Sequence, residues 1–220
     1  MDTSICWICQ KGLALTGEHM VKKSDLKRVF GRERPKKPLH LRRGKLTQEV
    51  ADYEDRILTF ETKICGDCNG TQTQKHDNAW MVLSKAFGDR TSLKPGDKIK
   101  LVDVFRNDTR EQMILVQLYF VKVLGCAMRD AGFKVDLQTF SDAIKNGIYH
   151  PHVYLSFGVV DESNLPKLAG GMAASNGEWG GYIYAADPIT VSVVARSFGD
   201  EVFDAWNPRY IGDEICIQAF

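Results

Sequence analysis

The chain has 220 residues and a net charge of +1, and 44% of its residues are hydrophobic and 26% charged. This composition is typical of a soluble globular protein with one sizeable domain or two small ones. A chain of this length can bury a core that is stable without cross-links. The chain shows no signal peptide, and its most apolar segment, residues 113–128, is shorter than the roughly 20 residues of a membrane span, so we expect a cytoplasmic protein without a membrane segment.

The first predicted elements are a metal-binding turn and a strand. Cys6 and Cys9 enclose two residues in a Cys-x-x-Cys pair. In a cytosolic protein such a pair is more typical of a metal site than of a disulfide bond. Residues 13–19 follow as a short predicted strand that ends in Glu18-His19.

A strongly basic segment comes next, between residues 22 and 45. It holds eleven Lys and Arg residues against two acidic ones, a net charge of +9 that leaves −8 for the rest of the chain. Pro35 and Pro38 favour irregular or extended backbone in this segment. One short segment therefore carries the positive field of an otherwise acidic protein.

The second cysteine pair lies between two predicted helices. Residues 47–58 have apolar side chains on one helical face, and residues 72–87 form the other predicted helix. Cys65 and Cys68 form the pair, and Asn69 follows it directly.

A linker is predicted at residues 89–99, which hold a Pro-Gly pair and no periodicity. It separates an N-terminal domain, residues 1–88, from a C-terminal domain, residues 100–220, and the fold class that we predict is α+β. The C-terminal elements that we expect are helices at 111–131 and 136–146 and strands at 152–160, 182–185, 190–196 and 215–219.

Four of the six cysteines are paired, and four thiolates in a tetrahedral array bind zinc in closed structural sites. The predicted zinc ligands are Cys6, Cys9, Cys65 and Cys68. The 55 residues between the two pairs exceed the spacing of simple zinc ribbons, which suggests that a functional segment lies between them. A purely structural zinc site is the alternative. The unpaired Cys126 and Cys216 have apolar surroundings and are predicted to be core residues.

Polar side chains lie beside both cysteine pairs. Glu18 and His19 follow the first pair, and Asn69 follows the second. Because zinc would hold the two pairs together, a carboxylate, an imidazole and a carboxamide could converge on one point. Carboxylate and amide oxygens suit a hard cation such as magnesium, and a neutral histidine suits a general base.

The order Cys-x-x-Cys, Glu-His, Cys-x-x-Cys-Asn resembles the ββα-metal, or HNH, endonucleases. It is most similar to the zinc-containing branch that includes phage Holliday-junction resolving endonucleases. Two runs carry the resemblance, which covers about residues 5–88 and none of 100–220: Thr16-Gly17-Glu18-His19 and Cys65-Gly66-Asp67-Cys68-Asn69-Gly70. The resemblance implies an N-terminal ββα-metal domain with a two-knuckle zinc site.

The resemblance also implies an activity, the metal-dependent hydrolysis of DNA, as in phage defence or mobile elements. His19 would be the general base, and Glu18 and Asn69 would hold a magnesium or manganese ion on the scissile phosphate. His76 and Asp77, about two helical turns beyond Asn69, are further candidate ligands of that ion. The usual acid beside the base is Asp, so the Glu in this sequence is a departure from the family pattern.

Basic side chains between the catalytic pair and the second knuckle are candidate DNA contacts, because Lys and Arg supply most non-specific affinity for phosphate. The residues that we expect to bind DNA are Lys22, Lys23, Lys36, Lys37, Arg42 and Arg43. A solvated basic loop without such a role is the alternative.

Two other functions fit the same sequence. One is a non-catalytic, zinc-stabilised module that binds DNA or protein. The other is the effector subunit of a larger complex, active only with a partner. The C-terminal domain could select the target, form a homodimer or bind a partner protein.

Overall fold

The computed structural model describes residues 4–31, 39–43, 46–50, 52–90, 92–133, 136–159, 169–175, 179–196, 205–207 and 212–220. Helices and strands are mixed along the chain, so the predicted α+β class is confirmed. The sequence predicted most of the C-terminal elements at their observed positions.

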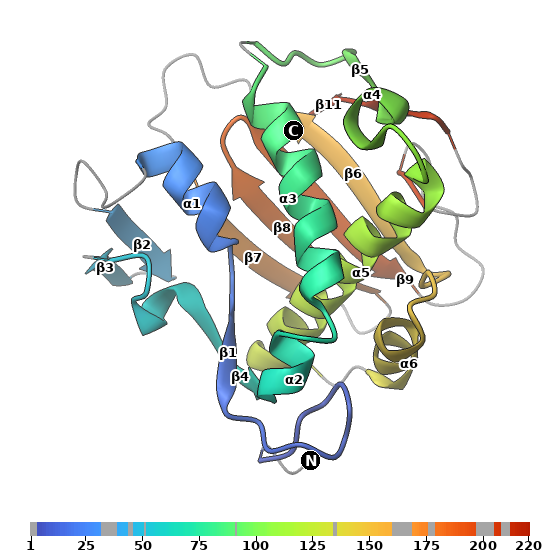
Figure 1. Ribbon diagram of the computed structural model, residues 1–220. Coiled ribbons are helices and arrows are strands. Elements are labelled where there is room, and N and C mark those ends of the chain that lie inside the picture. Colours follow the sequence, from blue (N-terminus) through green and yellow to red (C-terminus); the bar gives the residue numbers. More distant parts are fainter. Residues whose placement is uncertain are drawn as a thin grey trace.

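A five-stranded sheet forms the back of the molecule (Figure 1). Its order is β11-β6-β9-β8-β7, and β11 runs parallel to β6 while the other neighbours are antiparallel. The strand bounds are Val153–Val159 (β6), Ala169–Ser175 (β7), Trp179–Ala186 (β8), Ile189–Arg196 (β9) and Gln218–Ala219 (β11).

Two long helices lie over one face of this sheet: α3 (Gln74–Gly88) and α5 (Thr109–Asp130) (Figure 1). They meet the sheet through aromatic side chains, since the ring of Trp80 packs against those of Tyr119, Phe120 and Tyr184. Within the part of the chain that the structure describes, α5 alone is long and apolar enough to cross a membrane, but 83% of the apolar window is buried in the protein. Its apolar surface is therefore core surface, consistent with a soluble protein.

The N-terminal part packs against the ends of these helices. Strand β1 (Thr16–His19) pairs antiparallel with β4 (Thr59–Ile64), and the chain then enters the short helix α2 (Gly66–Asn69) and α3. The register of β1 and β4 shifts between Gly17 and His19, an irregularity of the kind that re-aims side chains next to functional sites.

Shorter elements complete the fold. The bounds are Lys23–Phe30 (α1), Leu39–Arg43 (β2), Leu46–Val50 (β3), Arg56–Leu58 (η1), Lys98–Lys100 (β5), Leu101–Phe105 (α4), Gln138–Asn146 (α6) and Glu214–Cys216 (β10). Strand β2 pairs with β3, and β5 with β10. Helix α6 ends at Asn146, the predicted last residue, and Gly147 follows with a φ of 64°, a left-handed conformation that glycine reaches without strain.

Residues on both sides of the predicted linker belong to one buried hydrophobic cluster. Trp7 from the first knuckle fits against Gly125 in α5, where an added Cβ would lie 2.5 Å from the indole ring. The two predicted domains thus share core packing, and their separation at 89–99 stays a prediction.

Three expectations from the sequence were wrong. Within the predicted helix 47–58, residues 47–50 belong to a strand and residues 52–58 form turns and a 3-10 helix, because the carboxylates of Asp52 and Asp55 accept hydrogen bonds from backbone N–H groups two residues ahead. The start of the basic segment is helical, since Leu26 and Val29 in α1 are buried at helical spacing. Cys216 is exposed, whereas Cys126 is buried as predicted.

His150, in the turn before β6, is buried in its neutral form. Its Nδ1 atom accepts a hydrogen bond from the backbone N–H of His152 at 3.2 Å, so its Nε2 atom carries the proton and faces Oγ1 of Thr139 at 3.1 Å. Burial lowers the pKa of His150 from 6.5 to about 4, and the nearby His152 acts in the same direction.

The lowered pKa of His150 predicts an acid-sensitive fold. In the unfolded chain this histidine binds a proton near pH 6.5, whereas in the folded chain it binds one only near pH 4. The stabilisation of the fold by neutral His150 is therefore complete above pH 6.5 and is lost as the pH falls from 6.5 to 4. Between pH 7 and pH 5 the loss from this group is roughly 2 kcal/mol. Urea unfolding at both pH values is expected to show that His150→Gln loses about that much less than the wild type. Equal losses would contradict the prediction.

Candidate functional site

The four paired cysteines converge at one end of β1 and β4. The Sγ atoms of the four residues lie within 4.8 Å of one another, and those of Cys9 and Cys65 are 3.6 Å apart. A tetrahedral zinc ion with Zn–S bonds of about 2.3 Å places its sulfur ligands about 3.8 Å apart. The cluster can therefore hold a metal ion such as zinc, in agreement with the ligands that the sequence predicted: Cys6, Cys9, Cys65 and Cys68.

Backbone N–H groups point at two of the sulfur atoms. The N–H of Gly12 donates to Sγ of Cys9 at 3.3 Å, and that of Cys68 donates to Sγ of Cys65 at 3.4 Å. Gln10, with a φ of 58°, turns the chain between the first pair and Gly12. Such donors stabilise thiolates, which are the form that binds metal.

The thiols differ in acidity. Burial raises the pKa of Cys9, but hydrogen bonds from the backbone of Gly12 and Lys11 and the neighbouring thiols outweigh it and lower this pKa to about 7. Burial raises the pKa of Cys65 and of Cys68. Loading the cluster with a metal ion must therefore displace protons, which makes binding weaker as the pH falls.

Gly12 is expected to be essential for the closure of the cluster. An added Cβ at Gly12 would lie 2.8 Å from Cβ of Cys65 and 3.0 Å from its Sγ, so Gly12→Ala must push the two pairs apart. We expect zinc affinity to fall by about tenfold or more, as measured by competition with a chromophoric chelator. The matched control is Gly66→Ala, because nothing lies within 4 Å of a Cβ at that position. Equal affinities of the two variants would refute this role.

A pocket of about 410 Å³ opens beside the cysteine cluster. It brings together three predicted catalytic residues and two predicted DNA contacts. The residues that line it are Gly17, Glu18, His19, Lys22, Lys23, Ser24, Lys27, Asn69 and Asp77. Ser24 and Lys27 were not singled out in the sequence, although both lie in the basic segment.

His19 is oriented through one of its ring nitrogens. Its Nε2 atom lies 3.2 Å from the carbonyl oxygen of Tyr53, and a carbonyl only accepts, so Nε2 carries the proton and Nδ1 keeps a lone pair. Tyr53 is buried, and its hydroxyl donates to the carbonyl of Gly31 at 2.8 Å. The half-buried imidazole is therefore oriented by a fixed backbone group, as a general base requires.

Glu18 is buried and paired with an ammonium group from another part of the chain. Its Oε2 atom lies 2.9 Å from Nζ of Lys122 in α5, whose side chain is fully buried. Burial lowers the pKa of Lys122, but the carboxylates of Glu18 and Asp77 outweigh it, so this pKa is raised and the group stays charged. In the sequence Lys122 only interrupts an apolar segment, and nothing there connects it with the site.

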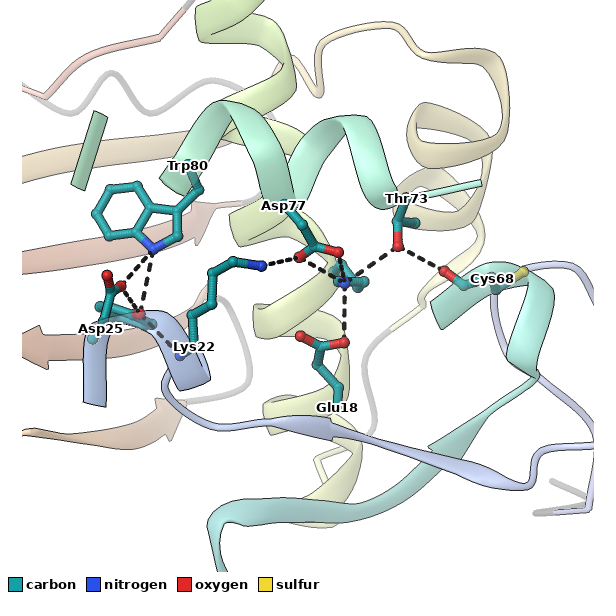
Figure 2. Close-up of polar contacts among 9 residues, drawn as sticks. Glu18, Lys22, Asp25, Cys68, Thr73, Asp77 and Trp80 are labelled. Atoms are coloured by element: carbon teal, nitrogen blue, oxygen red, sulfur yellow. Dashed lines mark hydrogen bonds and ion pairs between the residues drawn. The ribbon is translucent and has the colours of Figure 1, made fainter. Parts of the chain in front are cut away.

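Asp77 lies between two ammonium groups. Its carboxylate is 3.3 Å from Nζ of Lys22 and 3.3 Å from Nζ of Lys122. Lys122 also lies 3.3 Å from Oγ1 of Thr73, whose hydroxyl donates to the carbonyl of Cys68 at 2.8 Å. Figure 2 shows how these contacts connect Lys22 and Asp77 with Thr73 and the second cysteine pair.

A buried carboxylate, Asp25, anchors α1 and its lysines beside the pocket. It accepts a hydrogen bond from Trp80 at 3.0 Å (Figure 2) and further hydrogen bonds from Ser84 and Tyr184. The Tyr184 hydroxyl also accepts a bond from the backbone N–H of Lys22 at 3.0 Å. In the sequence Asp25 is only an acidic residue within the basic segment. Its structural role could not be predicted there, because its partners lie on α3 and β8.

The side chains around Glu18 do not fit a divalent cation in this arrangement. The carboxylates of Glu18 and Asp77 already face ammonium groups, and the amide of Asn69 donates through Nδ2 to the carbonyl of Gly17 at 3.2 Å. A hard cation needs several free oxygen ligands. The magnesium or manganese ion that the resemblance implies stays a prediction, and no step below depends on it.

Of the other predicted residues, one lies outside the pocket and four fall wholly or partly outside the described residues. His76 does not line the pocket: it is fully buried, and burial followed by the charge of Lys122 lowers its pKa to about 4. Lys36 and Lys37 lie outside the described residues. The backbone of Arg42 and Arg43 belongs to β2, but their side chains are outside the described part.

Comparison with known proteins adds no relative to this picture. No protein-family model matches the chain, and neither does a curated protein or a solved structure. The function must therefore be argued from the site itself.

Proposed function

We propose that the protein is an endonuclease that hydrolyses phosphodiester bonds of DNA, with His19 as the general base. The observation that carries the proposal is the pocket, which unites the Glu18-His19 pair, Asn69 and basic side chains beside the cysteine cluster. These groups come from segments far apart in the sequence. Their meeting in one place is what a hydrolytic site for a polyanion requires.

The chemistry assigned to His19 is proton abstraction. Its bare Nδ1 atom accepts a proton from a water molecule as the water oxygen attacks phosphorus, while the carbonyl of Tyr53 holds the ring through Nε2. The bond from phosphorus to the leaving oxygen breaks, and that oxygen takes up a proton from solvent. The products are a phosphate monoester end and a hydroxyl end.

Positive charge for the phosphate comes from lysines at the start of α1. Lys22, Lys23 and Lys27 line the pocket, and ammonium groups stabilise the charge on phosphate oxygens. Lys23 also forms an exposed ion pair with Glu54. Exposed pairs of this kind are weak, so a phosphate can compete for this lysine.

The order of elements supports the same proposal. Strands β1 and β4 pair antiparallel although α1, β2, β3 and η1 lie between them in the chain, α2 follows β4, and the cysteine cluster joins the strand side to the helix side. This is the order that the resemblance to ββα-metal endonucleases implies, and the role of the metal would be to clamp the two sides together.

Incubation of the zinc-loaded protein with supercoiled plasmid tests the proposal. Nicked or linear DNA is expected with the wild type, and the rates with magnesium, manganese or EDTA show whether added cations contribute. His19→Ala is the matched variant, and nicking that survives this substitution would remove the proposed mechanism.

A non-catalytic nucleic-acid-binding module is the second candidate. The pairing of Glu18 with Lys122 and of Asn69 with Gly17 favours it, because both polar groups then have structural partners. This candidate predicts DNA binding without plasmid nicking under any of the conditions above, and a DNA affinity that does not depend on His19.

A further inference from the structure

Lys122 is a fully buried lysine whose ammonium group has a complete set of partners. Its Nζ atom lies 2.9 Å from Glu18, 3.3 Å from both carboxylate oxygens of Asp77 and 3.3 Å from Oγ1 of Thr73. An ammonium group has three N–H donors, and these three residues supply one acceptor group for each. Lys122 is therefore held in the position of a central ion, surrounded by oxygen atoms.

The surrounding oxygen atoms are those that would attract a metal ion. Glu18 on β1 and Asp77 on α3 are brought to the same point, and both side chains are less than one-fifth exposed. Two nearly buried carboxylates at one point are unstable without a cation between them. In this protein the cation is supplied by the chain itself, from α5.

A divalent ion at the same carboxylates would meet this charge at close range. The Lys122 side chain is 0% exposed, so little water screens it, and like charges repel strongly in such surroundings. Lys22 adds a second ammonium group on Asp77 at 3.3 Å. The carboxylate pair is thus neutralised by two lysines before any ligand arrives.

The rest of the pocket then presents positive charge. Lys23 and Lys27 line it and are not among the partners of Glu18 or Asp77, and a pocket of about 410 Å³ has room for a phosphate group. Without Lys122 only the ammonium group of Lys22 would remain beside the two carboxylates, and Glu18 would lose its charged partner. One buried side chain therefore increases the positive charge that the pocket offers to a ligand.

We propose that Lys122 is a built-in cation of the pocket, which holds Glu18 and Asp77 in place of a divalent metal ion and leaves the pocket selective for a phosphate group. The role of Lys122 does not depend on the proposed function. Only the identification of the bound phosphate group as a phosphodiester of DNA rests on it. Lys122 acts through the two carboxylates, so it is a positioning residue.

Two variants of the 220-residue, zinc-loaded chain test this role. Lys122→Met keeps the length of the side chain and removes the charge, and Lys122→Arg keeps the charge. Mn²⁺ binding is measured by electron paramagnetic resonance and inorganic phosphate binding by titration calorimetry. Lys122→Met is expected to bind Mn²⁺ at least ten times more tightly than the wild type and phosphate about five times more weakly. Lys122→Arg is expected to stay close to the wild type in both.

Two results would overturn the proposal. One is an unchanged Mn²⁺ affinity in a folded Lys122→Met protein. The other is Mn²⁺ binding by the wild type that is lost in Glu18→Gln, which needs no folded Lys122 variant. DNA cleavage is not a readout in these measurements. A protein that shows the expected binding but does not nick plasmid supports the role of Lys122 and rejects the proposed function.

Discussion

Replacing His19 with alanine is expected to reduce the rate of plasmid nicking by about 100-fold or more, because a positioned general base contributes this much to a proton-transfer step. The carbonyl of Tyr53 holds the imidazole through Nε2, so Nδ1 is the nitrogen that would accept the proton. Initial rates of supercoil loss measure the effect. DNA affinity, measured by fluorescence anisotropy, is expected to change little, since the lysines of α1 stay in place.

His152→Ala is the control for the loss of a histidine. His152 is half-buried and is not part of the pocket lining, so its variant is expected to nick at the wild-type rate. Thermal unfolding of both variants shows whether the fold is intact. Nicking by His19→Ala at the wild-type rate would exclude His19 from the chemistry and favour a binding module or a different base.

Loss of one cysteine of the cluster is expected to have the largest effect on stability. Cys68 is fully buried, and its neighbour Thr73 links the second pair to Lys122 and hence to the pocket. Cys68→Ser is expected to lose zinc and on the order of 5 kcal/mol of stability or more, because the free energy of binding a structural zinc ion is also folding free energy. Zinc content and thermal unfolding are the measurements.

Cys216→Ser is the matched control, since Cys216 is exposed and does not belong to the cluster. It is expected to retain both zinc and stability. The Cys68 variant is also expected to lose nicking, because the end of β1 and the start of α2 are held together by the cluster. A Cys68→Ser protein that keeps its zinc and its melting temperature would show that the four thiols do not hold a structural metal.

The sequence predicted those parts of the site whose geometry depends on residues a few positions apart in the chain. The Cys-x-x-Cys spacing places two thiols on one turn, so the cluster of four followed from two pairs. The helices α5 and α6 and most strands of the large sheet also followed, because their apolar patterns are long or end at clear turn signals. Glu18, His19 and Asn69 do line one pocket, and their catalytic roles stay predictions.

The failures of prediction have a common cause. Residues 47–58 have helical spacing, but Asp52 and Asp55 give the backbone other hydrogen-bond partners. Helix α1 was hidden because its charged residues dominate its composition, whereas only Leu26, Val29 and Asp25 are buried. In both segments the choice between helix and other structure depends on which side chains and backbone groups find packing or hydrogen-bond partners in the folded protein. The sequence does not give the positions of those partners.

The sequence by itself determined the two cysteine pairs, the polar pair Glu18-His19 and the positive charge of the basic segment, because each depends on residues close together in the chain. Only the tertiary structure decided the electrostatics of the pocket. In the sequence Lys122 is a single charged residue within an apolar segment, and Asp25 is one of two acidic residues within the basic segment. The packing of α5 against β1 and α3 makes Lys122 the partner of Glu18 and Asp77. A buried charge needs an opposite charge beside it, and folding brings that charge from a distant part of the chain.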